Sequence, residues 1–411
     1  MKKNNIPALR FPQFNEPWAV KKLGEVGDVR DGTHDSPKYT TDGYPFITSK
    51  NLMDDGCISF ENINYISKED FDKFNKRSKV DKGDILLAMI GTIGNPVIVT
   101  SSGFAIKNVA LIKKSEKIIN RFLFQILKSE STIRAYSYLN VGNTQKFIAL
   151  GQIRSLPISL PTLPEQQKIA DFLSGVDEKI GQLERRLALE EQYKKGMMQR
   201  LFDQEIRFKD DNGNEFPDWE EKKFDHFFNV GSSKRVLQEN WTSEGVAFYR
   251  TRELVSKSKG EAFRSEIFIS KELYEELSSR YGVPTEGDFL VSGVGTLGIC
   301  YQVKSNDRFY FKDGNVLWFK LMNNELYSLF FYYCFQTDFI QNQITGQASK
   351  STVGTYTIQN AKKTALPYPT LPEQQKIADF LSSLDDKIGQ TKAELEKARV
   401  WKRGLMQRMF V

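Results

Sequence analysis

Several stretches of this chain combine arginine, lysine, asparagine and small polar residues, whose side chains donate or accept hydrogen bonds. Arginine can donate two parallel hydrogen bonds to guanine, asparagine can pair with adenine, and lysine suits phosphate or guanine. Residues of these types gather in two stretches of each half. Ordinary surface charge and turn chemistry is the alternative explanation for any one residue. The candidate contacts are Thr33, His34, Lys38, Ser49, Lys50 and Asn51, and Lys234, Arg235, Tyr249, Arg250 and Arg252.

Two polar loops provide further candidates, because they occupy the same place in both halves. Each loop follows a segment, over residues 121–139 and 326–343, for which we expect helix. Small polar donors and a lysine on a flexible backbone suit contact with base edges or phosphates, and a solvated turn is the alternative. Their recurrence favours function. The candidate residues are Asn143, Thr144, Gln145 and Lys146, and Gln347, Ser349 and Lys350.

Catalytic chemistry finds little support in the sequence. The two histidines, His34 and His226, lie one in each half, which argues against a metal–histidine cluster or a two-histidine mechanism. The chain contains no glycine-rich phosphate loop and no N/D/S-P-P-Y/F methyltransferase signature. The acidic and lysine residues over 217–222 resemble parts of a nuclease motif, but they are packed too closely to hold a metal. We expect no catalytic residue, no metal and no cofactor bound by this chain.

An internal repeat organises the elements that position these residues. Residues 161–174 read PTLPEQQKIADFLS, and residues 369–382 read the same letters. The preceding segments are also related, though more loosely. We therefore divide the chain into two similar domains, 1–160 and 203–368, each followed by a helical segment, 161–202 and 369–411.

Each helical segment carries apolar residues at alternating spacings of four and three, which is typical of a coiled-coil seam. Pro164 and Pro372 suit the first turn of a helix. An apolar seam is stable only when it packs against a second one, so we expect the two helices to pack antiparallel. Each should be roughly 60 Å long at 1.5 Å per residue. The seam residues are Ile169, Leu173, Val176, Ile180, Leu183 and Leu187, and Ile377, Leu381, Leu384, Ile388 and Leu395.

Short strand-like runs bounded by glycine, such as 84–90 and 288–294, predict mixed domains. The predicted fold class is α+β, with two α/β domains separated by two long antiparallel coiled-coil helices and a pseudo-two-fold internal repeat.

Charge and composition indicate the kind of surface that the chain has and the cell compartment in which we expect it. Residues 1–160 carry 23 basic and 16 acidic side chains, whereas residues 203–368 carry 20 and 23, so no uniform basic surface is expected. The three cysteines, Cys57, Cys300 and Cys334, lie far apart and suggest free thiols. The apolar stretch 326–339 is shorter than a bilayer span and favours a buried helix. Pro7 interrupts the first segment before any apolar run, so we expect no secretory signal and a cytoplasmic protein.

The chain resembles the specificity subunits of type I restriction-modification systems. The helix openings Leu163 to Lys168 and Leu371 to Lys376 look like that family's two central repeats. The run from Gly83 to Leu87, followed by Gly91 to Gly94, looks like its target recognition domains. The resemblance implies a non-catalytic subunit that selects an asymmetric, two-part site on double-stranded DNA. Its implied partners are two copies of a methyltransferase subunit, which would bind S-adenosylmethionine, and an endonuclease/translocase subunit in the full complex. No membrane partner is implied.

The polar residues of the repeated helix openings are retained in both copies, which seam packing alone does not demand. We therefore expect two equivalent docking surfaces for two copies of one partner. Recent duplication or gene conversion is the alternative. The candidate docking residues are Glu165, Gln166, Gln167 and Lys168, and Glu373, Gln374, Gln375 and Lys376. A competing function from another class is a coiled-coil adaptor whose end domains bind proteins.

Overall fold

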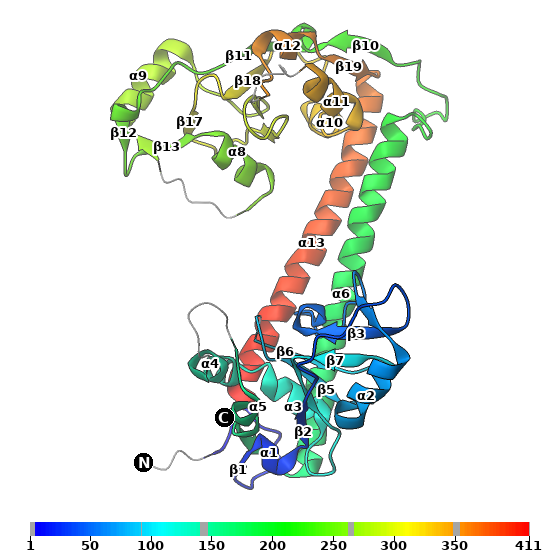
Figure 1. Ribbon diagram of the computed structural model, residues 1–411. Coiled ribbons are helices and arrows are strands. Elements are labelled where there is room, and N and C mark those ends of the chain that lie inside the picture. Colours follow the sequence, from blue (N-terminus) through cyan, green and yellow to red (C-terminus); the bar gives the residue numbers. More distant parts are fainter. Residues whose placement is uncertain (1–4, 92, 140–146, 262–266, 348–353, 411) are drawn as a thin grey trace. The chain divides into compact units, whose positions relative to one another are not determined.

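A computed structural model describes residues 5–91, 93–139, 147–261, 267–347 and 354–410 (Figure 1). The chain forms two compact units. Unit 1 contains residues 1–186 and 391–411, and unit 2 contains residues 187–390. Each unit thus combines one mixed domain with one end of both long helices.

Unit 1 contains two main sheets and a short two-stranded ribbon. The first sheet is antiparallel, with the strand order β2-β8-β5-β6, and the second has the order β4-β3-β7, in which β3 and β7 run parallel. The ribbon pairs β1 with β9. The strands are β1 (Ala19–Lys22), β2 (Val29–Asp31), β3 (Tyr44–Thr48), β4 (Asn64–Ile66), β5 (Ile85–Ala88), β6 (Gly94–Ile98), β7 (Ala105–Lys107), β8 (Val109–Ile112) and β9 (Pro157–Leu160). The short helices are α1 (Leu23–Val26), η1 (Ser49–Asn51), α2 (Lys68–Ser78), α3 (Asn120–Leu127), α4 (Glu130–Leu139) and α5 (Leu150–Arg154).

Unit 2 repeats this arrangement with local additions. Its sheets have the orders β11-β18-β15-β16 and β12-β14-β13-β17, with β13 parallel to β17, and its ribbon pairs β10 with β19. The strands are β10 (Glu220–Lys223), β11 (Phe228–Gly231), β12 (Trp241–Thr242), β13 (Val246–Tyr249), β14 (Phe268–Ile269), β15 (Phe289–Ser292), β16 (Cys300–Gln302), β17 (Phe309–Phe311), β18 (Val316–Leu321) and β19 (Ala365–Tyr368). The short helices are α7 (Phe224–Phe227), η2 (Gln238–Asn240), α8 (Thr251–Ser258), α9 (Lys271–Tyr281), α10 (Ser328–Cys334), α11 (Asp338–Gln347) and α12 (Ile358–Lys363).

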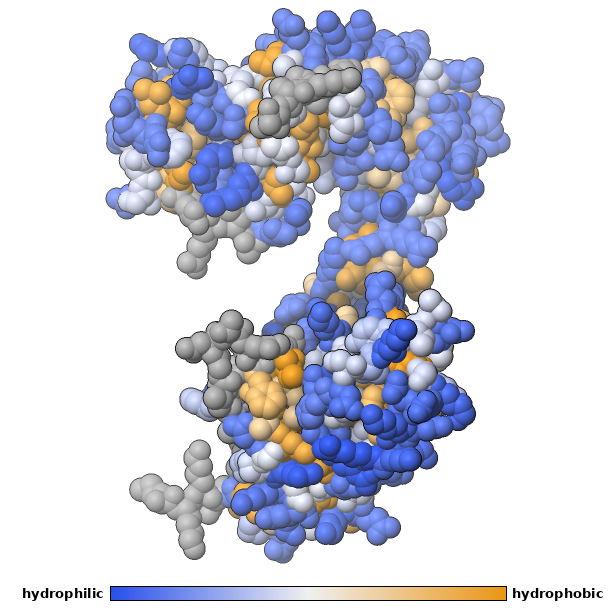
Figure 2. Space-filling view, in the orientation of Figure 1, coloured by the Kyte–Doolittle hydropathy of each residue, from blue (hydrophilic) through white to orange (hydrophobic). Residues whose placement is uncertain are grey.

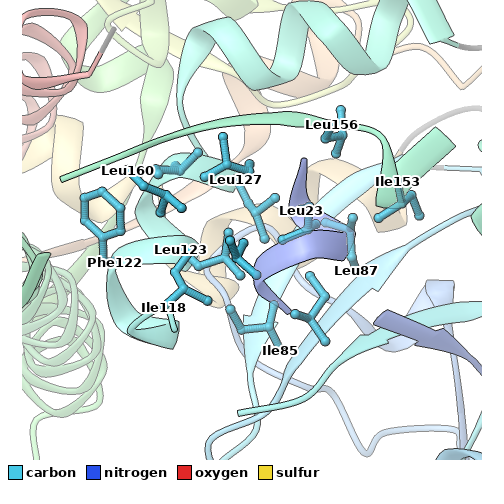
Figure 3. Close-up of a cluster of buried hydrophobic side chains, with 14 of the residues drawn as sticks. Leu23, Ile85, Leu87, Ile118, Phe122, Leu123, Leu127, Ile153, Leu156 and Leu160 are labelled. Carbon is cyan, nitrogen blue, oxygen red and sulfur yellow. The ribbon is translucent and has the colours of Figure 1, made fainter. Parts of the chain in front are cut away.

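The core of unit 1 lies between its first sheet and the helices that cover it. Leu23, Ile85, Leu87, Leu123 and Leu127 converge from α1, β5 and α3 (Figure 3). All four residues of β5 are buried, as are all four of its counterpart β15. A strand buried on both faces is predicted by a continuous apolar run, which is ILLA in β5 and FLV, followed by the buried Ser292, in β15.

The two long helices are α6 (Leu163–Phe202) and α13 (Leu371–Met409), and they run antiparallel within each unit. In unit 1 the Lys402 ammonium pairs with Asp177, and in unit 2 Lys194 pairs with Asp385 at 2.6 Å. These are the same two positions of the repeat. The predicted fold class of mixed domains and antiparallel helices is confirmed.

Most predicted seam residues are buried. They include Ile169, Leu173, Val176 and Leu183 of α6, and Ile377, Leu381, Ile388 and Leu395 of α13. Thr391 interrupts the apolar series but is also fully buried.

The helical segments expected over 121–139 and 326–343 are each divided into two short helices. The breaks fall at Ser129 and Thr337. The Ser129 hydroxyl accepts a hydrogen bond from the Thr132 amide, and the Thr337 hydroxyl donates to the Cys334 carbonyl at 2.7 Å. Such local bonds compete with a continuous helix. Among the described residues, no helix is long and apolar enough to cross a lipid bilayer.

Candidate nucleic-acid interface

Three segments of unit 1 meet where β2, β3 and β7 end. Because β3 and β7 are parallel, their carboxyl ends lie at the same edge of the sheet. The Asn108 amide donates to the Thr33 carbonyl at 3.2 Å, and the Ser49 hydroxyl donates to the Asn108 carbonyl at 3.2 Å. The two candidate stretches around residues 33 and 49 are therefore neighbours.

His34 lies at this edge and is exposed. Its Nδ1 lies 2.7 Å from Asn108 Oδ1, and its Nε2 lies 3.0 Å from Asp31 Oδ2. Asp31 is buried and also pairs with Arg77 of α2. Around α2 the visible face of unit 1 is covered mainly by hydrophilic residues (Figure 2). The ring of His34 is thus held by side chains from a strand and a turn while its surface remains accessible.

Unit 2 places a different pair at the same position. Counted from Val29 of β2 and Val230 of β11, His34 and Arg235 occupy equivalent positions. Lys107-Asn108 corresponds to Lys312-Asp313 through the strand registers, because Ile106 pairs with Ile47 as Phe311 pairs with Tyr249. Arg235 Nε donates to Asp313 Oδ2 at 2.8 Å, as His34 contacts Asn108. Burial raises the pKa of Asp313, but hydrogen bonds and charge from Arg235 and Lys312 lower it below its usual value overall. The two units therefore present different hydrogen-bonding groups at one place in the fold.

The turn after β13 adds two arginines to this edge. The Lys312 amide donates to the Tyr249 carbonyl at 2.8 Å, which joins this turn to the β17–β18 loop. Arg250 and Arg252 both pair with the carboxylate of Glu253, which is 1% exposed. The candidate stretches around residues 235 and 250 are thus brought together as in unit 1.

Two predicted contact residues have other roles. Tyr249 is buried, and its ring stacks on Phe309 with 4.6 Å between centroids, so the prediction that it contacts DNA is wrong for this conformation. Asn51 Oδ1 accepts a hydrogen bond from the Thr48 amide at 2.9 Å, and Asn51 Nδ2 donates to the Ser59 carbonyl. The Asn51 amide therefore shapes the turn after β3 rather than facing a base.

The remaining described candidates differ in exposure. Lys38 and Lys50 are exposed in unit 1. Lys234 is exposed in unit 2, with its ammonium 5.6 Å from the centroid of the Tyr281 ring. Thr33 is half-buried, and its hydroxyl accepts from the Asp35 amide at 3.0 Å.

The polar-loop candidates Asn143, Thr144, Gln145, Lys146, Ser349 and Lys350 lie outside the described residues. The backbone of Gln347 ends α11, and its side chain is not described.

Half of the predicted docking residues are inside the protein. Glu165 is 1% exposed, accepts two hydrogen bonds from the Arg10 guanidinium at 2.7 and 2.8 Å, and accepts a third from the Trp18 indole at 3.3 Å. Buried Gln166 accepts from the Ile119 amide and donates to the Pro161 carbonyl. These contacts tie the helix opening to its own domain.

Unit 2 makes the same contacts. Glu373 is bound by Arg207 and Trp219, and Gln374 accepts from the Tyr327 amide and donates to the Pro369 carbonyl. The prediction that Glu165, Gln166, Glu373 and Gln374 face a partner is therefore corrected, because their polar atoms are buried and paired within the chain. This role also explains why these residues are identical in both copies.

The other predicted docking residues are accessible to different degrees. Lys168 and Gln375 are exposed, and Gln167 and Lys376 are half-buried. Lys376 donates to Asp211 at 2.6 Å. The same two helices carry two exposed aromatic residues, Tyr193 and Trp401, at equivalent positions of the repeat.

Sequence reasoning missed Asn108, Asp313 and Glu253. Asn108 and Asp313 each follow a lysine, which is the last residue of β7 in unit 1 and the first residue after β17 in unit 2, and alignment of the two halves through those strands would have found them. Glu253 looked like an ordinary surface carboxylate. Among the described residues, no cluster of three or more histidine, cysteine or acidic side chains could hold a metal ion.

Comparisons with known proteins agree with this arrangement. A family model described as the type I restriction modification DNA specificity domain matches residues 15–191 and 217–398. The type I restriction enzyme MjaVIII specificity subunit of Methanocaldococcus jannaschii is 24% identical over 430 residues, covering 97% of this chain and 94% of that protein.

Two solved structures share the fold. The S subunit of a type I restriction-modification system from M. genitalium has a TM-score of 0.60 and 18% identity, with 99% of both chains covered. A chain from a structural study of complex assembly and conformational transition of the type I R-M system has a TM-score of 0.57 and 15% identity, with 97% of this chain and 98% of that chain covered.

Proposed function

The chain belongs to the family of type I restriction-modification DNA specificity subunits, and from this premise we propose that it reads an asymmetric, two-part sequence in double-stranded DNA. Each unit reads one part through the edge at which its second sheet ends. The chain itself carries out no reaction. It selects the site at which its partner subunits act.

The observation that carries this proposal is the difference between His34–Asn108 and Arg235–Asp313. The same fold places both pairs at the same edge, at 2.7 and 2.8 Å. His34 and Asn108 present an imidazole and an amide, whereas Arg235 and Asp313 present a guanidinium and a carboxylate. Base pairs differ in their donor and acceptor patterns in the major groove, so different reading groups select different half-sites.

We also propose that two methyltransferase subunits dock on the long helices, with an endonuclease/translocase subunit added in the full complex. The methyltransferase would bind S-adenosylmethionine. The burial of Glu165 and Glu373 moves the expected contacts to exposed side chains of the same helices. These are Lys168 and Trp401 in unit 1, and Gln375 and Tyr193 in unit 2.

Exchange of the unit 1 reading groups tests the proposal. The full chain is co-expressed with the methyltransferase of its own host, and the methylated sequences are mapped across the genome. His34→Arg with Asn108→Asp should change one half-site and leave the other intact. A change in both half-sites would refute the proposal that each unit reads one half-site.

A binding titration addresses the adaptor alternative. Contacts to DNA phosphates make affinity fall steeply with salt. An affinity for DNA that is absent, or insensitive to salt and sequence, would leave the coiled-coil adaptor as the better explanation.

A further inference from the structure

We propose that Arg250 reads a guanine in the half-site of unit 2, and that the buried carboxylate of Glu253 is the positioning residue that aims it. This inference rests on the proposed function and adds the identity of a base and of the residue that recognises it. It depends on contacts that are all within unit 2.

Both carboxylate oxygens of Glu253 accept hydrogen bonds from the neighbouring arginines. Its Oε2 accepts from the Arg250 amide at 2.9 Å and from Arg250 Nε at 3.0 Å. Its Oε1 accepts from Arg250 Nη2 at 2.7 Å and from Arg252 Nε at 3.1 Å. Burial alone would raise the pKa of Glu253, but the hydrogen bonds and charge from Arg250 lower it below its usual value. The carboxylate is therefore ionised and fixes the plane of the Arg250 guanidinium.

The remaining edge of this guanidinium suits a base. Nε and one hydrogen of Nη2 face Glu253, which leaves the Nη1–Nη2 edge with two parallel N–H groups. Among the described residues, Nη1 of Arg250 has no hydrogen-bond partner. Two parallel donors match the O6 and N7 acceptors that guanine presents in the major groove. The side chain is 30% exposed, so this edge is reachable while the stem is held.

The element that carries Arg250 is itself anchored. Lys257 of α8 donates to Asp307 at 3.1 Å, and Tyr301 donates to the same buried carboxylate at 2.6 Å. The Thr251 hydroxyl donates to the Val294 carbonyl at 3.3 Å. A rigid support lets a side chain discriminate between bases, because little freedom remains to be lost on binding.

Unit 1 serves as an internal control for a merely structural role. The equivalent turn has Thr48 in place of Arg250 and Asn51 in place of Glu253, and Asn51 closes that turn with the same bond to the backbone amide, at 2.9 Å. An asparagine is therefore sufficient for the turn. The buried carboxylate of unit 2 does something more, which is to hold the arginine.

The test uses the full chain purified with the methyltransferase of its own host, and a pool of DNA with randomised half-sites. Wild-type protein should require a G·C pair at one position of the half-site assigned to unit 2. Arg250→Lys keeps the charge but loses the paired donors, so preference for guanine at that position should fall roughly 10- to 100-fold. Glu253→Gln keeps an acceptor for the turn and should reduce preference at the same position only.

Two further variants and a measurement of stability separate the outcomes. Arg280→Lys, an exposed arginine of α9 paired with Glu276, should leave the selected sequence unchanged. Thermal unfolding identifies any variant that fails to fold, and Arg250→Gln provides a second substitution. If Arg250→Lys and Arg250→Gln fold and select the wild-type sequence, or weaken binding equally to all sequences, the inference is overturned while the proposed function stands. If wild-type protein selects no sequence at all, the proposed function itself has failed.

Discussion

Removal of the Arg10 guanidinium is the sharpest test of the role assigned to the repeated helix openings. The Glu165 carboxylate is 1% exposed, and without Arg10 it would keep, among the described residues, only the Trp18 indole at 3.3 Å as a side-chain donor, as in an Arg10→Met variant. A buried charge that loses its partner keeps its desolvation penalty without compensation. We therefore expect a large loss of stability in unit 1.

The size of the loss follows from burial. Removing one partner of a buried ion pair costs about 3–5 kcal/mol. For a unit of about 200 residues, each kcal/mol shifts Tm by about 2–4 °C, so the transition should fall by about 6–20 °C. Differential scanning calorimetry of the full chain at pH 7 measures this shift. Because the pair is buried, added salt should change the loss only slightly.

Two variants control for other effects. Lys168→Ala removes an exposed charge from the same turn of helix and should change stability by no more than about 0.5 kcal/mol. Arg10→Met combined with Glu165→Gln removes the buried charge, keeps an acceptor for Trp18, and should restore more than half of the loss. An Arg10→Met protein as stable as Lys168→Ala would refute the structural explanation of the repeat. If that protein also lost one methyltransferase copy, a direct docking role for Glu165 would be restored.

Two further predictions concern unit 2. Burial raises the pKa values of Asp307 and Asp313, but neighbouring donors and cations lower both pKa values below the ordinary 3.8. Each carboxylate therefore adds stability that is present above about pH 4 and is lost as the pH falls through the lowered pKa. Asp313→Asn should lower Tm at pH 7 and make Tm fall less steeply between about pH 5 and pH 3, and an unchanged curve of Tm against pH would contradict this. Gly245 has φ of 130°, and a Cβ there would lie 2.2 Å from the Ile269 carbonyl oxygen, whereas Gly213 has φ of 84° and open space. Gly245→Ala should thus cost several times the stability that Gly213→Ala costs in urea unfolding, and equal losses would show that the close approach is not limiting.

The long helices could be predicted because their pattern is local and periodic. The spacing of Ile169, Leu173 and Val176 specifies a buried seam whatever lies beside it, and all three are buried. The polar residues beside them could not be placed by the same logic. Glu165 was assigned to a docking surface because its retention in both copies exceeds what seam packing demands. Its partner, Arg10, is distant in sequence, and no residue beside Glu165 in the sequence indicates that the two side chains pair.

The candidate interface could likewise be predicted from the sequence only in part. The stretches around His34 and Ser49 were recognised from residue type, and the structure brings them together. Asn108 was missed because its place depends on the parallel pairing of β3 with β7, which is a long-range contact. One local signal was available but unused, since Ser67 and Ser270 each precede an acidic helical turn and cap α2 and α9 through their hydroxyls.

The division of the chain has a consequence for the order in which it folds during synthesis. Unit 2 is continuous in sequence, whereas unit 1 needs residues from both ends of the numbering. Leu405 and Met409 belong to the buried core around Trp18 and Phe122, and the Leu9 amide donates to the Arg408 carbonyl at 2.8 Å.

The mixed domain of unit 1 therefore leaves the ribosome with part of its apolar surface uncovered. At about 5–20 residues per second, the roughly 200 residues of unit 2 take on the order of 10–40 s to be made before the covering helix arrives. During this interval the exposed surface is open to chaperones and to other nascent chains. A chain that stops near residue 390 would retain that surface permanently, so truncation there should damage the first domain to be made rather than the last.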